Sequence, residues 1–270
     1  MPALRLMTFN VQMLPLGAML LTGKTNNAEE RADTVAQAIL SLPADEQPDV
    51  IVFNEVFDED GRKRLVDRLT GYPNRMQKMD STFYLEDSGL MLFSKHELVV
   101  MPCGKRTLEY IYDASAGDDS QAAKGVCVVQ INQPTDAVTI AFTHLQASYN
   151  SDNEHADVRE AQLLSVIGTI AEALNENHSE RWRNVIFVGD LNIRSDRGSS
   201  TNEWSAVFEN GPLGAIFADG WHQWMASPQG SRKDDGLTNI DFEDGVMRRL
   251  DYQCFRHPTT PPTSCRITCR

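Results

Sequence analysis

The sequence VIFVGDLN, residues 185–192, predicts a strand that is buried on both faces and leads into polar side chains. Gly189 is expected to end this strand, and Asp190 and Asn192 follow one residue apart. Alternate residues of an extended chain point to the same side, so these two side chains should project together. A carboxylate and a carboxamide there can hold a hard cation and bond to a phosphate. The structural alternative is a loop with turn-forming Asp and Asn.

An apolar strand followed by an acid, an amide or a histidine recurs along the chain. Three further strand-like runs end near Asn10, Glu55 and His144, and the last such run carries Asp251. Each of these residues alone is more often structural than functional. Because rigid strands commonly present functional groups at their ends, the joint pattern indicates one shared site.

Two acids in polar loops, Asp87 and Asp119, extend this set. Carboxylates and amides without cysteine suit an oxygen-preferring cation such as Mg²⁺ and do not suit zinc. A single histidine among them, His144, suits charge stabilisation on a phosphate ester or proton delivery to it.

The distribution of apolar residues predicts an α+β fold. Helical spacing occurs at 28–42 and 157–174, and Asp58 can cap a third, shorter helix. Strand-like runs are more numerous; they lie at 4–11, 50–53, 90–93, 98–101, 126–131, 138–142, 185–188 and 250–252. Many strands with few helices between them favour two sheets packed face to face with helices outside.

Composition narrows the class of protein. The 270 residues, 41% hydrophobic and 23% charged, are ordinary for one large soluble domain. The net charge of -13 is unlike the basic surface that usually binds nucleic acid. A metal site can, however, offset the negative charge locally, so this argument is weak for an enzyme. No apolar run approaches the roughly 20 residues of a transmembrane segment, and no convincing signal peptide is present. Cys103 and Cys127 could pair across neighbouring strands, but buried free thiols are favoured.

Short motifs carry a resemblance to a known family. They are TFN at 8–10, NEVF at 54–57, KG at 124–125, THLQA at 143–147, GDLN at 189–192 and LDY at 250–252. In this order they resemble the endonuclease/exonuclease/phosphatase superfamily. Within it, the chain is similar to the neutral, bacterial-type sphingomyelinases. This narrower resemblance rests on MLP at 13–15, FNEVF at 53–57, Ala147, VR at 158–159 and QL at 162–163.

The resemblance implies a four-layer α/β sandwich of two packed, mostly antiparallel sheets flanked by helices. It also implies a Mg²⁺-dependent phosphodiesterase, other divalent cations being alternatives, that hydrolyses sphingomyelin to ceramide and phosphocholine by metal-activated water attack. Carried over by position, Asn10 and Glu55 would hold the metal. Asp190 and Asn192 would join the metal site and position the attacking water, and His144 would stabilise the pentacovalent phosphate.

The remaining acids match the family to different degrees. Asp119 falls where the family has an acid near the metal site, and Asp87 matches less closely. Asp251 corresponds to a catalytic acid whose family partner is the histidine of a closing Ser-Asp-His motif. After Asp251 this sequence has only His257, six residues on and about 20 Å away in an extended chain.

The absence of the closing motif shapes the expected organisation. We expect an endonuclease/exonuclease/phosphatase-like domain over 1–257 and an irregular tail over 258–270, with the last strand missing. The aromatic hairpin that membrane-active sphingomyelinases place before that motif would also be missing. Trp221 and Trp224 come too early to replace it, so a core or loop role is favoured for both.

Several functions stay open on the sequence. The first is a sphingomyelinase-type enzyme, impaired by loss of the C-terminal histidine, whose partner is a phosphodiester substrate with a phospholipid head group. The alternatives are a nuclease or an inositol-phosphate phosphatase of the same superfamily, and a folded but inactive metal- and phosphate-binding remnant. The location stays open: without a convincing signal peptide the sequence as it stands favours the cytoplasm, while the resemblance also admits a secreted or membrane-peripheral location. The sequence leaves the oligomeric state open.

Overall fold

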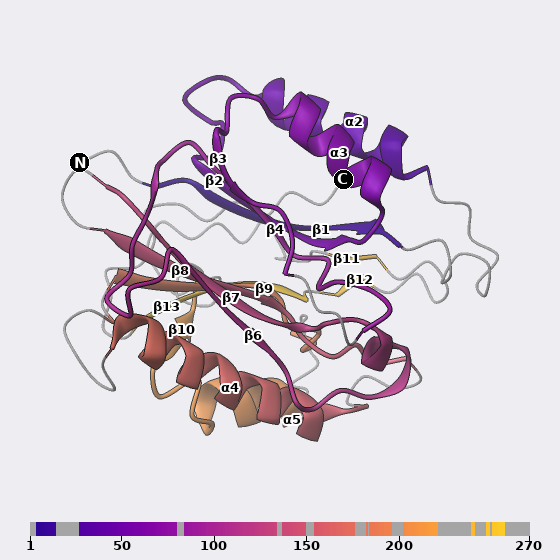
Figure 1. Ribbon diagram of the computed structural model, residues 1–270. Helices are drawn as coiled ribbons and strands as arrows, with labels where there is room; N and C mark the ends of the chain where they lie inside the picture. Colours follow the sequence, from indigo (N-terminus) through magenta and orange to yellow (C-terminus); the bar gives the residue numbers. More distant parts are fainter. Residues whose placement is uncertain are drawn as a thin grey trace.

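The structure is a computed structural model in which two β-sheets face each other and helices cover their outer faces (Figure 1). It describes residues 4–14, 27–79, 84–133, 137–149, 154–175, 182, 184–195, 202–220, 239–240, 247–248 and 250–256. Helix, sheet, sheet and helix therefore form four layers, as the sequence analysis predicts.

The first sheet has the strand order β1-β2-β4-β3. Its members are β1 (Leu6–Met13), β2 (Val50–Val56), β3 (Asn74–Met76) and β4 (Met91–Ser94). β1 and β2 run parallel, and the other two pairings are antiparallel.

The second sheet has the order β10-β13-β9-β8-β7-β5, with β6 also paired to β7. Its members are β5 (Leu98–Val99), β6 (Thr107–Ile111), β7 (Gly125–Ile131), β8 (Val138–His144), β9 (Val185–Asp190), β10 (Phe217–Asp219) and β13 (Asp251–Arg256). Only β8 and β9 run parallel, so both sheets are mostly antiparallel as predicted. β11 (Asn239–Ile240) and β12 (Met247–Arg248) form a separate antiparallel pair.

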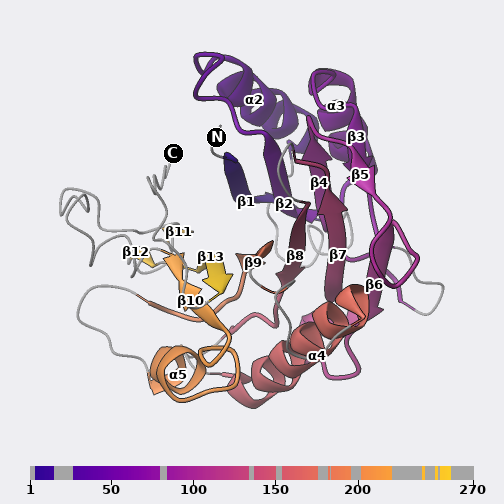
Figure 2. The same cartoon turned by 90° about the vertical axis from the view of Figure 1, so that its left-hand side faces the viewer.

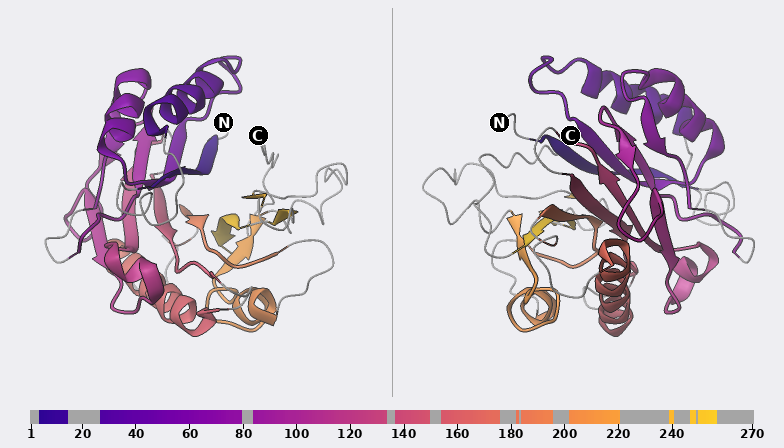
Figure 3. Two further views of the ribbon diagram at one scale, coloured as in Figure 1. Left: turned by 90° about the vertical axis from the view of Figure 1, so that its right-hand side faces the viewer. Right: turned by 60° about the vertical axis from the view of Figure 1, so that its left-hand side comes forward.

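Helices lie on both outer faces of the sandwich (Figures 2 and 3). α2 (Ala28–Leu40) and α3 (Glu59–Arg68) cover the first sheet, and α4 (Ala156–Leu174) covers the second. α5 (Asn202–Trp204), the π-helical turn η3 (Ser205–Glu209) and the 3-10 turn η1 (Gly117–Gln121) are short. The predicted cap of α3 is confirmed, because the Asp58 side chain accepts a hydrogen bond from the Gly61 amide. None of the helices described here is long and apolar enough to cross a membrane.

The layers follow from strict alternation of side chains along buried strands. In β2, Ile51 and Phe53 join the core beneath α2 and α3, whereas Val50 and Val52 join the core between the sheets. β7, β8 and β9 divide in the same way between the core under α4 and the core between the sheets. A polar residue in phase with Val52 therefore points inward, toward the opposite sheet.

Asn54 shows the consequence of this phase. It is fully buried, and its Nδ2 donates to the Thr143 carbonyl on the other sheet at 2.9 Å. A buried amide that bridges two sheets fixes their spacing, because either group left without a partner would cost free energy.

Two differences from the sequence analysis concern strand limits. The prediction that Gly189 ends its strand is wrong: β9 continues to Asp190, since Gly189 lets the chain pass close to Thr143 on β8. The short strands β3, β6, β10, β11 and β12 were not predicted, because two to five residues carry too little periodicity.

Other predictions concern the cysteines and the end of the chain. Cys103 and Cys127 are free thiols, as favoured above, although only Cys127 is fully buried. β13 pairs with both β9 and β10 and is thus an interior strand. His257, the predicted tail over 258–270, Trp221 and Trp224 lie outside the described residues, so the missing last strand stays a prediction.

Candidate active site

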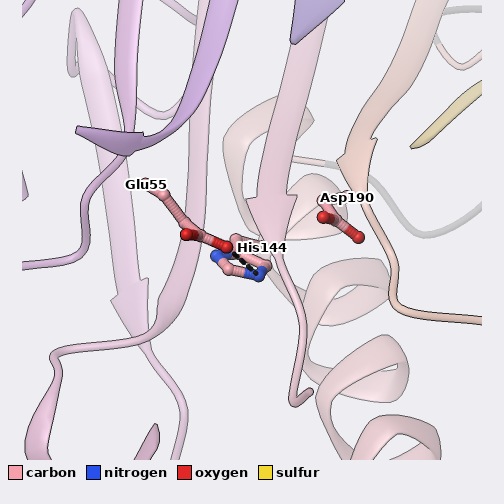
Figure 4. Close-up of side chains that lie close together, drawn as sticks. All are labelled: Glu55, His144 and Asp190. Carbon is pink, nitrogen blue, oxygen red and sulfur yellow. Dashed lines mark ion pairs between the residues drawn. The ribbon is translucent and has the colours of Figure 1, made fainter. Parts of the chain in front are cut away.

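Three predicted site residues meet where the two sheets face each other. Ligand atoms of Glu55, His144 and Asp190 all lie within 4.8 Å of one another. Figure 4 shows the Glu55 carboxylate beside the imidazole ring, with Glu55 Oε1 3.8 Å from His144 Nε2. Glu55 comes from β2 in the first sheet, and the other two come from the adjacent strands β8 and β9 in the second.

Alternation and register place His144 and Asp190. Phe142 and Val188 face the core between the sheets, so the residues two positions later point the same way. The parallel register then sets His144 directly opposite Asp190. This register needs a glycine at 189, where φ is 144° and a Cβ atom would collide with the Thr143 carbonyl oxygen.

Glu55 reaches the cluster by a different route. Alternation would point it toward the helices, in phase with Ile51 and Phe53. Its backbone instead takes a left-handed conformation, with a φ of 59°. This conformation costs a residue with a side chain about 1–3 kcal/mol and is concentrated at functional sites.

Asn10 connects the two carboxylates. Its Nδ2 donates to Glu55 Oε1 at 2.7 Å and to Asp190 Oδ2 at 3.0 Å, while its oxygen accepts from the Gln12 amide at 2.9 Å. In this arrangement Asn10 orients both acids through its NH₂ group. The predicted direct ligation of a metal by Asn10 stays a prediction.

Asn192 lies beside the cluster but not on an extended strand. Its φ is 53°, and its amide N–H donates to Asp190 Oδ1 at 2.9 Å, which makes a turn. The expectation that alternation aligns Asp190 with Asn192 is therefore wrong. The Asn192 Nδ2 instead donates to the Leu145 carbonyl at 2.9 Å, next to His144.

The His144 imidazole is buried. Burial, followed by the nearby Lys124 charge, lowers its pKa, although Asp190, Glu55 and Asp119 act in the opposite direction. The imidazole is consequently neutral near pH 7. Its Nδ1 has no hydrogen-bond partner among the described residues, so this ring can still bond to a ligand.

Asp119 is held in place near the cluster by a buried ion pair. Its Oδ2 lies 2.8 Å from Lys124 Nζ and accepts from the Ala147 amide at 2.7 Å. Burial raises the pKa of the carboxyl, but Lys124, His144 and the Ala147 amide outweigh it and hold the pKa below its usual value. Lys124 also donates to the Leu145 carbonyl at 2.8 Å, so this pair fixes the segment after His144.

Asp87 and Asp251 are placed differently. Asp87 Oδ2 lies 2.6 Å from the Arg62 guanidinium, outside the metal-ligand group found among the described residues. Asp251 lies opposite Asp190 in the antiparallel β13–β9 register, which brings its strand to the cluster. Its catalytic role stays a prediction.

Helix α4 supports the loop after His144. Arg159, fully buried, forms two hydrogen bonds to the Glu203 carboxylate at 2.7 and 2.8 Å and donates to the Gln146 carbonyl at 2.9 Å. The Gln146 amide in turn donates to Gln162 at 2.9 Å. Gln146, Arg159 and Gln162 entered the sequence analysis only through motifs of the family resemblance, and no structural role was predicted for them or for Arg62. The available signal was a charged residue on a buried helix face, as with Arg62 beside Leu65 in α3.

The donor set fits a divalent cation. Glu55 and Asp190 bring two negative charges together, and no lysine or arginine in the described part of the chain forms an ion pair with either. Like charges at this separation repel each other, and a cation between them removes that cost. Because the donors are oxygens and one neutral imidazole, without thiolates, a hard cation fits better than a soft one.

Fold, site and similarity to known proteins together define a phosphodiester hydrolase. The chain belongs to the endonuclease/exonuclease/phosphatase family, whose model matches residues 7–268. Sphingomyelinase C of Bacillus cereus is 26% identical to it over an alignment of 273 positions, which covers 92% of this chain and 74% of that protein.

Solved structures show the same fold. Sphingomyelinase C from Streptomyces griseocarneus superimposes with a TM-score of 0.68 at 22% identity, covering 97% of this chain and 87% of that one. A variant of beta toxin from Staphylococcus aureus with bound magnesium ions gives a TM-score of 0.69 at 20% identity, covering 96% and 86%.

Proposed function

We propose that this protein is a Mg²⁺-dependent phosphodiesterase of sphingomyelinase type that releases phosphocholine from sphingomyelin. The observation that carries the proposal is the convergence of Glu55, His144 and Asp190 within 4.8 Å. The relatives named sphingomyelinase C and the neighbour with bound magnesium ions support the substrate and the cation.

Each residue of the cluster has a chemical role in this proposal. Glu55, oriented by Asn10, would hold the cation. When bound, Mg²⁺ supplies a Lewis acid and lowers the pKa of water. Asp190 and Asn192 would orient the attacking water and the phosphoryl oxygens. The neutral His144, whose Nδ1 is without a partner among the described residues, would donate a hydrogen bond to the charge that develops on the phosphate.

The metal assignment is tested by calorimetry. Glu55→Gln keeps the shape of the side chain but removes its charge, so Mg²⁺ affinity should fall by more than about tenfold. Glu160→Gln, on the exposed face of α4, is the matched control and should bind as the parent does. Unchanged Mg²⁺ binding by Glu55→Gln would contradict the assignment.

The substrate is tested by comparing the rates at which three classes of phosphate ester are cleaved. Phosphocholine release from sphingomyelin in mixed micelles should exceed cleavage of plasmid DNA and of an inositol polyphosphate at equal enzyme and Mg²⁺ concentrations. The net charge of -13 disfavours DNA, because a polyanion is repelled by an acidic surface. Faster DNA cleavage would favour the nuclease, and no turnover with intact Mg²⁺ binding would favour the inactive remnant.

A further inference from the structure

The buried Arg62 side chain contacts the backbone that carries Glu55. One terminal nitrogen, Nη2, donates to the Val56 carbonyl at 2.6 Å and to Asp87 Oδ2 at 2.6 Å. The other, Nη1, lies 2.8 Å from Glu59 Oε1. The Arg62 side chain is only 4% exposed and the Asp87 side chain 9%, so both charges depend on this pairing.

The contacts close a ring around Val56. Asp87 Oδ1 accepts from the Gly89 amide at 2.7 Å, and the Gly89 carbonyl accepts from the Val56 amide at 2.9 Å. Both backbone polar groups of Val56 are therefore held, one by Arg62 and the other by Gly89. We call Arg62, Asp87 and Gly89 the Val56 clamp.

Gly89 completes the clamp, because a residue with a side chain would be strained at this position. Its φ is 63°, and a Cβ atom at this position would lie 2.8 Å from the Phe57 ring. A glycine thus lets the loop pass close enough to β2 for the Gly89 carbonyl to accept a hydrogen bond from the Val56 amide without that strain. Loop and strand are locked together directly beside the metal-ligand cluster.

Glu55, the residue before Val56, is the one that needs such support. Its left-handed φ of 59° interrupts the alternation of β2 and turns the carboxylate toward His144 and Asp190. A conformation of this kind persists only where the surroundings impose it. Asn10 holds the carboxylate end of the side chain, and the Val56 clamp holds the backbone end.

We propose that Arg62 and Asp87 are positioning residues of the metal site: they fix the Val56 peptide, and thereby hold Glu55 in the conformation that presents its carboxylate to the cation. The inference rests on the proposed function for the identity of that cation. It also makes Asp87 a residue that positions the metal site from outside, and not a metal ligand or a catalytic acid.

The competing explanation is that the ion pair merely anchors α3. The two explanations predict different Mg²⁺ affinities for variants that still fold: a positioning role predicts weaker binding, and a purely structural role predicts unchanged binding. Calorimetry with Mg²⁺ alone, without substrate, should show affinity reduced by about 10- to 100-fold in Asp87→Asn and in Arg62→Lys, as for other residues that orient metal ligands. Turnover of a soluble phosphodiester should recover as Mg²⁺ is raised, because the ligands themselves are intact.

Asp33→Asn is the matched control. Asp33 pairs with Arg64 and Arg68 of the same helix α3, whereas within the described part of the chain it is Arg62 that donates to the Val56 carbonyl. Removing its charge weakens the attachment of α3 to α2 and should leave Mg²⁺ affinity as in the parent. A loss of affinity in Asp33→Asn equal to that in Asp87→Asn would overturn the inference.

A double variant covers the case in which Asp87→Asn does not fold. Replacing a buried ion pair by neutral groups often preserves stability, whereas removing one partner does not. Arg62→Met/Asp87→Asn should therefore unfold near the parent's urea midpoint, yet bind Mg²⁺ about 10- to 100-fold more weakly. Parental affinity in the folded double variant would overturn the inference.

Glu55→Gln separates the two proposals. If the parent binds Mg²⁺ and Glu55→Gln does not, while the clamp variants bind normally, the clamp is refuted and the proposed metal site stands. If the parent and Glu55→Gln bind alike, or the parent binds no Mg²⁺, the metal assignment falls and the clamp inference with it.

Discussion

Gly189→Ala tests how the cluster of Glu55, His144 and Asp190 is assembled. Gly189 lies opposite Thr143 in the parallel β8–β9 ladder, and its φ of 144° is accessible almost only to glycine. An added Cβ atom would meet the Thr143 carbonyl oxygen, so the two strands would have to separate. The same ladder sets His144 opposite Asp190.

The magnitude follows from two costs. Backbone strain for a residue with a side chain in this conformation is about 1–3 kcal/mol. Overpacking against a rigid backbone adds about 1–3 kcal/mol. The free energy of unfolding should thus fall by about 2–6 kcal/mol in total. With an m-value of about 3 kcal/mol/M, the urea midpoint should fall by about 0.7–2 M.

Gly168→Ala is the same chemical change, but it should raise the free energy of unfolding where Gly189→Ala should lower it. Gly168 is exposed within α4, and a Cβ atom there meets nothing within 4 Å. Alanine is favoured over glycine inside a helix by about 1 kcal/mol, so its midpoint should rise slightly. Unfolding is followed by circular dichroism in EDTA, so that bound metal does not contribute to stability.

The turnover rate provides a second measurement for Gly189→Ala and its control Gly168→Ala. A displacement of about 1 Å between His144 and Asp190 can cost on the order of 100-fold in rate, which we expect for folded Gly189→Ala with excess Mg²⁺. Gly168→Ala should keep the parental rate. The reasoning is refuted if Gly189→Ala unfolds at or above the parental midpoint, or if both variants shift in the same direction.

Three further predictions test other parts of the structure. The pKa of Asp119 is lowered in the folded protein, so its contribution to stability is complete above its usual pKa of 3.8 and is lost as the pH falls through the folded pKa. The difference in urea midpoint between the parent and Asp119→Asn should therefore shrink below about pH 4. A difference that stays constant with pH would contradict this prediction. Glu203→Gln should cost about 3 kcal/mol by leaving a buried guanidinium without its counter-charge, whereas Glu172→Gln, in an exposed pair, should cost less than about 0.5 kcal/mol; equal losses would refute the contrast. Asn54→Ala should cost about 1–3 kcal/mol, because it leaves the Thr143 carbonyl without its inter-sheet partner, and parental stability would show that the sheets do not depend on it.

Local periodicity was enough to predict the layers. Alternation along a buried strand is set by the backbone itself, so the sequence indicates which residues share a face. From this alone Asn10, His144 and Asp190 could be expected at the ends of strands, and the structure confirms that they come together. The capped start of α3 at Asp58 is equally local and was equally predictable.

The family resemblance added what periodicity cannot provide. Motif order identified the family and implied that residues 180 positions apart, such as Asn10 and Asp190, act at one site. The strand–helix–strand order of β8, α4 and β9 is compatible with a parallel pair, but the register that sets His144 opposite Asp190 has no local signal.

Only the tertiary structure decided the conformations that break the local rules. Glu55 and Asn192 adopt left-handed backbones that no run of apolar residues encodes, because contacts from distant segments impose them. Asp87 looked like one more acid beside a strand until its partner was known to be Arg62, which is buried on α3. The sequence by itself therefore determined which polar residues the strands carry to the site. Long-range contacts decided which of them point into it and which hold the others in place, because pairing between distant segments depends on packing that local sequence does not specify.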